Sequence, residues 1–196
     1  NDSIDAMCFI LSNVEIGALK TLDLKNIENY LLERKEELLS SQLVELSEYF
    51  EKYDLTQSLE LAKLAYVRDA KSAWQYYVAL LNRVGSYESK AIALKVTKDI
   101  ATAGNVIACL LLAKRYEYQA TTKNDMLIAL YWYRMAAESG EVEAQLHLGE
   151  IYENGELVKQ DIDNAIYWYR VAAYNGSQYA KAKISYKSPN CIVKTL

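Results

Sequence analysis

Apolar side chains recur at three- and four-residue steps through most of this chain, and that period predicts helices. Within residues 141–176, one such series ends just before Gly155 and a second begins just after Asp161. Asp161 stands where a helix N-cap is expected, and Gly176 where a glycine commonly follows a helix. The two series therefore predict an antiparallel pair of amphipathic helices joined by a loop.

The same pattern occurs twice in succession with a spacing of 36 residues. Residues 105–140 and 141–176 are identical at 16 of 36 positions, including the string Tyr-Trp-Tyr-Arg at 131–134 and 167–170. A period of this length is typical of stacked helical repeats, because one hairpin cannot bury its apolar face without neighbours. We therefore predict an all-α fold, a right-handed α/α superhelical solenoid of antiparallel helix pairs.

The repeat weakens toward the N-terminus. Residues 69–104 form an imperfect copy of the repeat, in which Val96 stands at the position that Trp132 and Trp168 occupy in the two later copies. The pattern also predicts a single helix over 24–40, with an ion pair between Arg34 and Glu37 on its solvated side. We predict one continuous domain made of an N-terminal helical cap at 1–40, a repeat array at 41–187 and a C-terminal tail at 188–196.

Composition supports a folded helical protein. The 196 residues are 52% apolar and 24% charged, and they include one proline and seven glycines, so few residues interrupt helices. The formal charge of −4 and the lack of a dense Lys/Arg stripe make nucleic acid an unsuitable partner. No apolar run approaches 18 residues, so we expect no transmembrane segment.

The cysteines carry no pattern of chemistry. Cys8, Cys109 and Cys191 are scattered and show no CxxC spacing, so they predict neither a disulfide framework nor a zinc site. The chain starts at Asn1 rather than at a methionine. We therefore expect a processed or shortened form, from which any signal peptide would already be absent.

Catalytic residues are not predicted. His147 is the only histidine, and it lies on the polar side of its helix. Glu143 and Glu150 share that helix face, but no second cluster completes a metal coordination shell. Phosphate-binding and nucleophile-elbow motifs are absent from the sequence. We expect a protein that is not an enzyme, with no metal and no cofactor.

Most of the aromatic residues fit packing roles in the repeat. Tyr133 and Tyr169 fall on the apolar stripes beside the two later tryptophans, so we expect them between helix layers. Tyr131 and Tyr167 point away from those stripes, and we expect them to be half-exposed on the outer face.

The spacing of small, aromatic and glycine residues resembles a known family. The pattern Ala144-x3-Leu148-Gly149-x2-Tyr152-x2-Gly155, followed by Asp161-x3-Ala165-x2-Trp168-Tyr169-x2-Ala172-Ala173-x2-Gly176, resembles the Sel-one-like repeat, a relative of the tetratricopeptide repeat. The preceding copy departs from it at Ala113 and Gln119. The resemblance implies a non-enzymatic scaffold that binds another protein, or sometimes a glycan, on the curved face of the superhelix.

Many bacterial members of this family are exported and act in envelope assembly, host interaction or immunity against toxins. The resemblance therefore implies a periplasmic or secreted protein that organises an envelope complex or occludes a toxin, with a cytoplasmic location as the alternative. A second function also stays open, a glycan- or peptidoglycan-binding scaffold of the bacterial envelope in which Trp74 and tyrosines stack on sugar rings.

The repeat geometry places the first helix of each pair on the concave face. The slots there run from aromatic and apolar to acidic, which suits a partner with an apolar segment and a basic end, although an ordinary solvated face is equally consistent. The predicted partner-binding residues are Trp74, Val78, Asn82, Lys114, Tyr118, Glu150, Glu153 and Asn154. No small-molecule cofactor is expected there.

Overall fold

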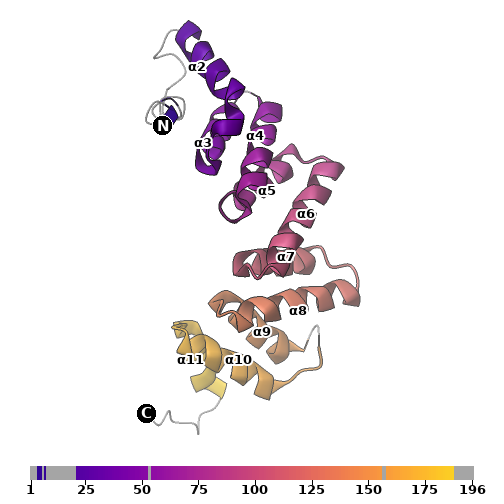
Figure 1. The fold of residues 1–196 in the computed structure, drawn as a ribbon. Coiled ribbons are helices and arrows are strands. Elements are labelled where there is room, and N and C mark those ends of the chain that lie inside the picture. The colour runs from indigo at the N-terminus through magenta and orange to yellow at the C-terminus, as the bar shows by residue number, and fades with distance from the viewer. Residues whose placement is uncertain (1–3, 6, 8–20, 53, 156–157, 188–196) are drawn as a thin grey trace. The chain divides into compact units, whose positions relative to one another are not determined.

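The computed structural model describes the chain except residues 1–3, 6, 8–20, 53, 156–157 and 188–196 (Figure 1). Helices are the only regular elements in the described part, which confirms the predicted all-α class. They are α2 (Thr21–Glu33), the 3-10 helix η1 (Lys35–Glu37), α3 (Ser40–Phe50), α4 (Leu55–Arg68), α5 (Ala70–Val84), α6 (Tyr87–Thr102), α7 (Val106–Tyr118), α8 (Lys123–Glu138), α9 (Val142–Asn154), α10 (Ile162–Tyr174) and α11 (Gln178–Lys187).

The chain divides into two compact units, residues 1–97 and residues 98–196, and α6 begins in the first and ends in the second. We describe each unit by itself. The predicted tail at 188–196, together with Cys8 and Cys191, lies outside the described residues. Cys109 is described, and its thiol is free and buried.

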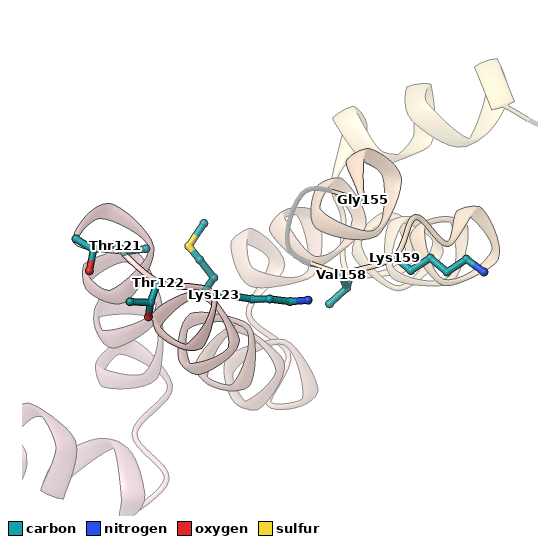
Figure 2. A pocket seen from close by; sticks show the side chains of 8 residues that line it. Thr121, Thr122, Lys123, Gly155, Val158 and Lys159 are labelled. Atoms are coloured by element: carbon teal, nitrogen blue, oxygen red, sulfur yellow. The ribbon is translucent and has the colours of Figure 1, made fainter.

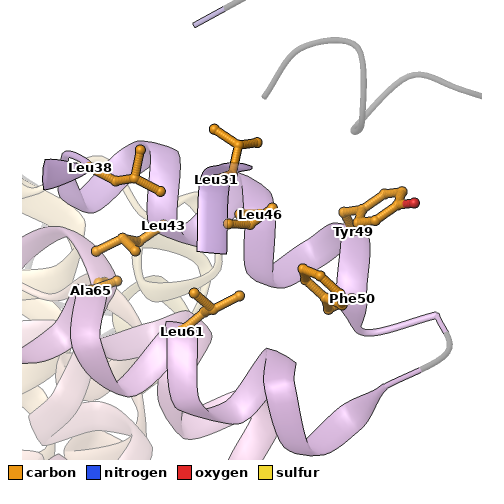
Figure 3. Close-up of a cluster of buried hydrophobic side chains, with 9 residues drawn as sticks. Leu31, Leu38, Leu43, Leu46, Tyr49, Phe50, Leu61 and Ala65 are labelled. Carbon is orange, nitrogen blue, oxygen red and sulfur yellow. The ribbon is translucent and has the colours of Figure 1, made fainter. Parts of the chain in front are cut away.

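The core of the first unit is built mainly by α3 and α4, which pack against each other and continue onto α5 (Figure 3). Leu43, Leu46 and Phe50 recur at three- and four-residue steps on α3 and form one core cluster with Leu61 and Ala65 of α4. The Asp54 side chain starts α4 by accepting a hydrogen bond from the backbone N–H of Gln57 at 2.9 Å.

The prediction of one helix over 24–40 is wrong. The α-helix ends at Glu33, a 3-10 turn follows, and α3 starts at Ser40. The break turns Leu38 into the core, where it is fully buried with Leu31. The predicted ion pair survives the break, with 3.2 Å between Arg34 Nε and Glu37 Oε1.

In the second unit, α7 packs on α8, α8 on α9, α9 on α10 and α10 on α11. Trp132 and Trp168 are buried and Tyr133 and Tyr169 are completely so, which confirms their predicted packing role. Gly149 of α9 permits the close approach of α10, because a Cβ there would lie 2.5 Å from a ring carbon of Tyr169.

Helix ends in the second unit follow the predicted chemistry. The Asp161 carboxylate accepts from the backbone N–H of Asn164 at 3.0 Å, so Asp161 is the N-cap of α10 as predicted. After α10, Gly176 adopts a φ of 104°, and the next N–H donates back to the carbonyl of Ala172 at 2.9 Å. This left-handed turn closes the helix, and it is most accessible to glycine.

Candidate functional site

The first helices of the second unit, α7, α9 and α11, are joined to one another by side chains. Lys114 Nζ of α7 lies 2.5 Å from Glu143 Oε1 of α9. One repeat later, the Tyr179 hydroxyl of α11 donates to Glu150 Oε1 of α9 at 3.2 Å. Glu150 is the equivalent of Lys114 and Tyr179 is the equivalent of Glu143, each 36 residues further along the chain. The two contacts therefore join the same pair of repeat positions. We call the side of α7, α9 and α11 that carries these contacts the first-helix face.

Two glutamates beside this face are held by buried tyrosines of the second helices. The Tyr133 hydroxyl donates to Glu117 Oε2 at 2.6 Å, and the Tyr169 hydroxyl donates to Glu153 Oε2 at 2.5 Å. Burial, reinforced by the neighbouring carboxylate, raises the pKa of both tyrosine hydroxyls well above the usual value. Both therefore remain neutral donors that fix the glutamates in place.

A second repeated contact stacks a side chain of the first-helix face onto each of these tyrosines. The His147 ring lies parallel to the Tyr133 ring, with 5.0 Å between centroids. In the equivalent slot of the next repeat, Lys183 Nζ lies 5.8 Å from the Tyr169 centroid and 3.2 Å from Glu153 Oε2. His147 is thus a half-buried packing residue whose Nδ1 lies 3.8 Å from Glu150.

The predicted binding residues of the first unit, all on α5, occupy different environments. Val78 is half-buried and Asn82 is exposed. Trp74 is only 2% exposed, so its indole belongs to the core and cannot stack on a ligand. The imperfect repeat explains the difference. The positions equivalent to Trp74 in the next two repeats hold Leu110 and Leu146, which are half-buried, whereas this position of α5 is fully buried.

The predicted residues of the second unit lie on or beside the first-helix face. Lys114, Tyr118 and Asn154 are exposed and Glu150 is half-buried. Glu153 is more enclosed than expected, because Tyr169 and Lys183 both bind its carboxylate. It supports the face rather than offering a free charge to a partner.

Three exposed side chains of this face are missing from the predicted set. Ile107 and Leu111 project from α7 one turn apart and are about half exposed, and Tyr179 of α11 occupies the same repeat slot as Ile107. The 36-residue register could have found Tyr179. The register also places Ile107 in the slot of Glu143 and Leu111 in the slot of His147, which indicates that both aliphatic side chains face outward.

The second helices carry a different exposed surface. Tyr131 of α8 and Tyr167 of α10 are 55% and 56% exposed, which confirms the prediction that they are half-exposed. Each lies edge-on against the tryptophan that follows it in sequence, with ring centroids about 5 Å apart. Leu127 of α8 and Tyr174 of α10 are also exposed.

The part of the chain that the structure describes was compared with two further kinds of site, a metal-ligand cluster and a membrane-spanning helix. Within it, no three His, Cys, Asp or Glu side chains come together as potential ligands of a metal ion. None of the described helices combines the length and the apolar character needed to cross a bilayer.

Comparison with known proteins identifies the repeats. The Sel1 repeat matches residues 106–141 and 142–177, one residue displaced from the periods read in the sequence. No curated protein matches the chain.

Solved structures with the same fold are larger than this chain. A Sel1 repeat protein from Oxalobacter formigenes is 23% identical, with a TM-score of 0.57 over 82% of this chain and 48% of its own. A protective antigen of uropathogenic Escherichia coli strains, which displays an SLR fold, is 24% identical, with a TM-score of 0.56 over 83% of this chain and 36% of its own. The chain thus spans about half or less of the length of these relatives.

An immunity protein from Pseudomonas aeruginosa, Pa5087, is 21% identical over 92% of this chain and 69% of its own, but its TM-score is only 0.44. The two relatives with higher scores agree with the predicted α/α solenoid class, and the matched repeats coincide with the helix pairs α7–α8 and α9–α10. The second unit thus contains two Sel1 repeats, at residues 106–141 and 142–177.

Proposed function

We propose that this protein is a non-enzymatic scaffold that binds a segment of a partner protein on the first-helix face of the second unit. The observation that carries the proposal is the exposed apolar strip on α7, where Ile107, Leu111 and Tyr118 share one side of the helix. Exposed apolar patches on folded proteins commonly mark interaction sites, and burying aliphatic and aromatic side chains drives association.

The polar part of the face sets the chemistry of the partner. Lys114 pairs with Glu143, and Lys183 pairs with Glu153, so these charges largely neutralise each other. Exposed pairs of this kind contribute little affinity and more specificity. The partner segment therefore places its apolar or aromatic side chains against α7. Its polar groups lie beside the ion pairs that α9 forms.

An enzymatic role finds no group to perform it on this face. His147 is stacked on Tyr133, and its Nδ1 lies 3.8 Å from Glu150. The glycan-binding alternative loses its proposed anchor, because the Trp74 indole is buried. From the resemblance of the repeats, we infer a bacterial envelope-assembly or toxin-immunity role in the periplasm or outside the cell.

Two leucines with equal exposure test the proposed face. Leu111 of α7 and Leu127 of α8 are each 45% exposed, and they lie on a first and a second helix respectively. We expect Leu111→Glu to abolish capture of a stoichiometric protein partner from the source cells, whereas Leu127→Glu leaves capture intact. Equal capture by both variants, with unchanged circular dichroism, would refute the assignment of the face.

A further inference from the structure

One position of the first helix carries a different kind of side chain in each copy of the repeat. It holds Leu111 in α7, His147 in α9 and Lys183 in α11, each 36 residues after the previous one. Leucine carries no charge and lysine carries one throughout the physiological range, whereas histidine gains or loses its proton between about pH 5 and pH 8. The three copies therefore compare a neutral, a titratable and a permanently charged side chain at one place.

Helix α11 shows what a positive charge does at this position. Lys183 Nζ lies 3.2 Å from Glu153 Oε2 and 5.8 Å from the centroid of the Tyr169 ring. The Tyr169 hydroxyl donates to the same carboxylate at 2.5 Å. The lysine thus forms an ion pair and a cation–π contact at once, and it joins α11 to α9 and α10.

The copy around His147 has equivalent partners. The Tyr133 hydroxyl donates to Glu117 Oε2 at 2.6 Å, and the His147 ring lies parallel to the Tyr133 ring with 5.0 Å between centroids. The Nδ1 atom of His147 lies 3.8 Å from Glu150 Oε2. The carboxylate and the ring that hold the lysine one repeat later are therefore both present, but the side chain beside them is charged only when it is protonated.

The charged groups around His147 are mostly acidic. The titratable residues that hydrogen bonds, ion pairs, ring contacts or electrostatic interactions connect to it are Lys114 and Glu117 of α7, Tyr133 of α8, Glu143, Glu150 and Glu153 of α9, Tyr169 of α10, and Tyr179 and Lys183 of α11. Both lysines of this network are paired with other glutamates. Among the described residues, neither Glu117 nor Glu150 forms an ion pair with a lysine or an arginine. Two carboxylates therefore lack the cationic partner that a protonated His147 would supply.

The network is built on helices. Each of its residues lies on α7, α8, α9, α10 or α11, and none of them lines the hollow at the loop edge of the second unit that Figure 2 shows. The contacts of His147 are therefore made by helices alone.

We infer that His147 is a pH-sensitive contact between the first helices of the second unit. Its protonation supplies the positive charge beside Glu117 and Glu150 that Lys183 supplies permanently one repeat later. The protonated ring also places that charge over the face of Tyr133. The second unit is therefore held together more firmly in mildly acidic solution than in alkaline solution.

The direction of the pH effect follows from where these partners exist. In the folded chain the protonated ring lies among carboxylates and over an aromatic face, whereas in the unfolded chain it lies in water. The folded state therefore holds the proton more firmly than the unfolded state, in which histidine is protonated below about pH 6.5. The stabilisation is complete below that pH, and it is lost as the pH rises and the folded protein releases the proton.

Urea unfolding of the full chain at about pH 5.5 and about pH 8 tests the inference. His147→Leu copies the preceding repeat and is neutral, and His147→Lys copies the next repeat and stays charged. Between about pH 8 and about pH 5.5, we expect the unfolding equilibrium constant of His147→Leu relative to wild type to rise roughly threefold, as for other partly exposed ion pairs. His147→Lys should be more stable than wild type at about pH 8 and similar to it at about pH 5.5.

Two glutamates separate the electrostatic effect from simple packing. Glu150→Gln removes the carboxylate beside Nδ1 and should reduce the pH dependence of the His147→Leu effect, whereas Glu138→Gln, at an exposed position of α8 outside the network, should leave it unchanged. Three results would overturn the inference: equal effects of His147→Leu at both pH values, a His147→Lys variant no more stable than His147→Leu, or equal responses to the two glutamine substitutions. No partner is present in this experiment, so its result is independent of the proposed function.

Discussion

At the scale of single residues, the second unit is defined by tyrosines that are buried by their rings and bonded by their hydroxyls. Tyr133 and Tyr169 each reach the glutamate sixteen residues earlier, on the preceding first helix. The ring fills the space between helices, and the hydroxyl donates to a half-buried carboxylate. Packing and polar pairing are therefore satisfied by one side chain.

Removing one hydroxyl tests this pairing. We expect Tyr169→Phe to lower the free energy of unfolding by about 1.5–3 kcal/mol, because a hydrogen bond to a charged group is lost and Glu153 stays half-enclosed. Urea unfolding of the variant measures the change. Tyr167→Phe, which alters an exposed hydroxyl on the same helix, should change stability by less than about 0.5 kcal/mol.

The same tyrosines predict a pH dependence. Their pKa values are raised in the folded protein, while tyrosine in the unfolded chain loses its proton near pH 10. Their contribution is therefore complete below about pH 10 and declines as the pH rises, because only the unfolded state releases protons there. We expect the stability of the double variant Tyr133→Phe/Tyr169→Phe to decline less steeply above pH 10 than that of the wild type. Parallel curves would contradict the assignment.

Trp168 should be a major contributor to the core. Its indole is buried between helix layers, so we expect Trp168→Ala to cost roughly 3–5 kcal/mol of unfolding free energy. Tyr167→Ala, at the exposed neighbouring position, should cost far less. A loss below about 1 kcal/mol for Trp168→Ala would mean that the helix register is wrong.

At the scale of helices, equivalent repeats start their second helix at different places. Asp125 and Asp161 occupy the same slot, but Asp161 is the N-cap of α10 whereas Asp125 is the third residue of α8. The difference arises three residues earlier, where one repeat has Thr122, which can cap a helix, and the other has Val158, which cannot. Helix α8 is therefore three residues longer than α10.

This difference predicts an asymmetric response to alanine. Thr122→Ala removes the cap of α8 and should cost about 1 kcal/mol, whereas Val158→Ala, in the same slot of the next repeat, removes no cap. The urea midpoints of both variants measure the effect. A larger loss for Val158→Ala would show that apolar contact in the loop, and not capping, stabilises this edge.

The sequence predicted the second unit much better than the first. Positions 36 residues apart carry similar residues because they pack against equivalent neighbours. Comparing the two copies therefore identifies the buried positions, the helix caps and the turn glycines. The break after Glu33 had no such signal, since the segment contains neither glycine nor proline. The burial of Trp74 and the enclosure of Glu153 depend on side chains of other helices, which one helix's periodicity cannot reveal.

At the scale of the whole molecule, the second unit contains both Sel1 repeats and the proposed first-helix face. Its first-helix face offers an apolar strip on α7 beside charges that already pair with one another. We expect a protein partner to contact this face.

Two equally exposed tyrosines allow that claim to be tested directly. Tyr118 at the end of α7 and Tyr174 at the end of α10 are each 91% exposed, so a photo-crosslinking amino acid at either site samples solvent equally. The measurement is crosslinking in the source cells followed by mass spectrometry. We expect a defined protein adduct from position 118 that is lost with Leu111→Glu, and none from position 174. An adduct from position 174 alone would contradict this expectation.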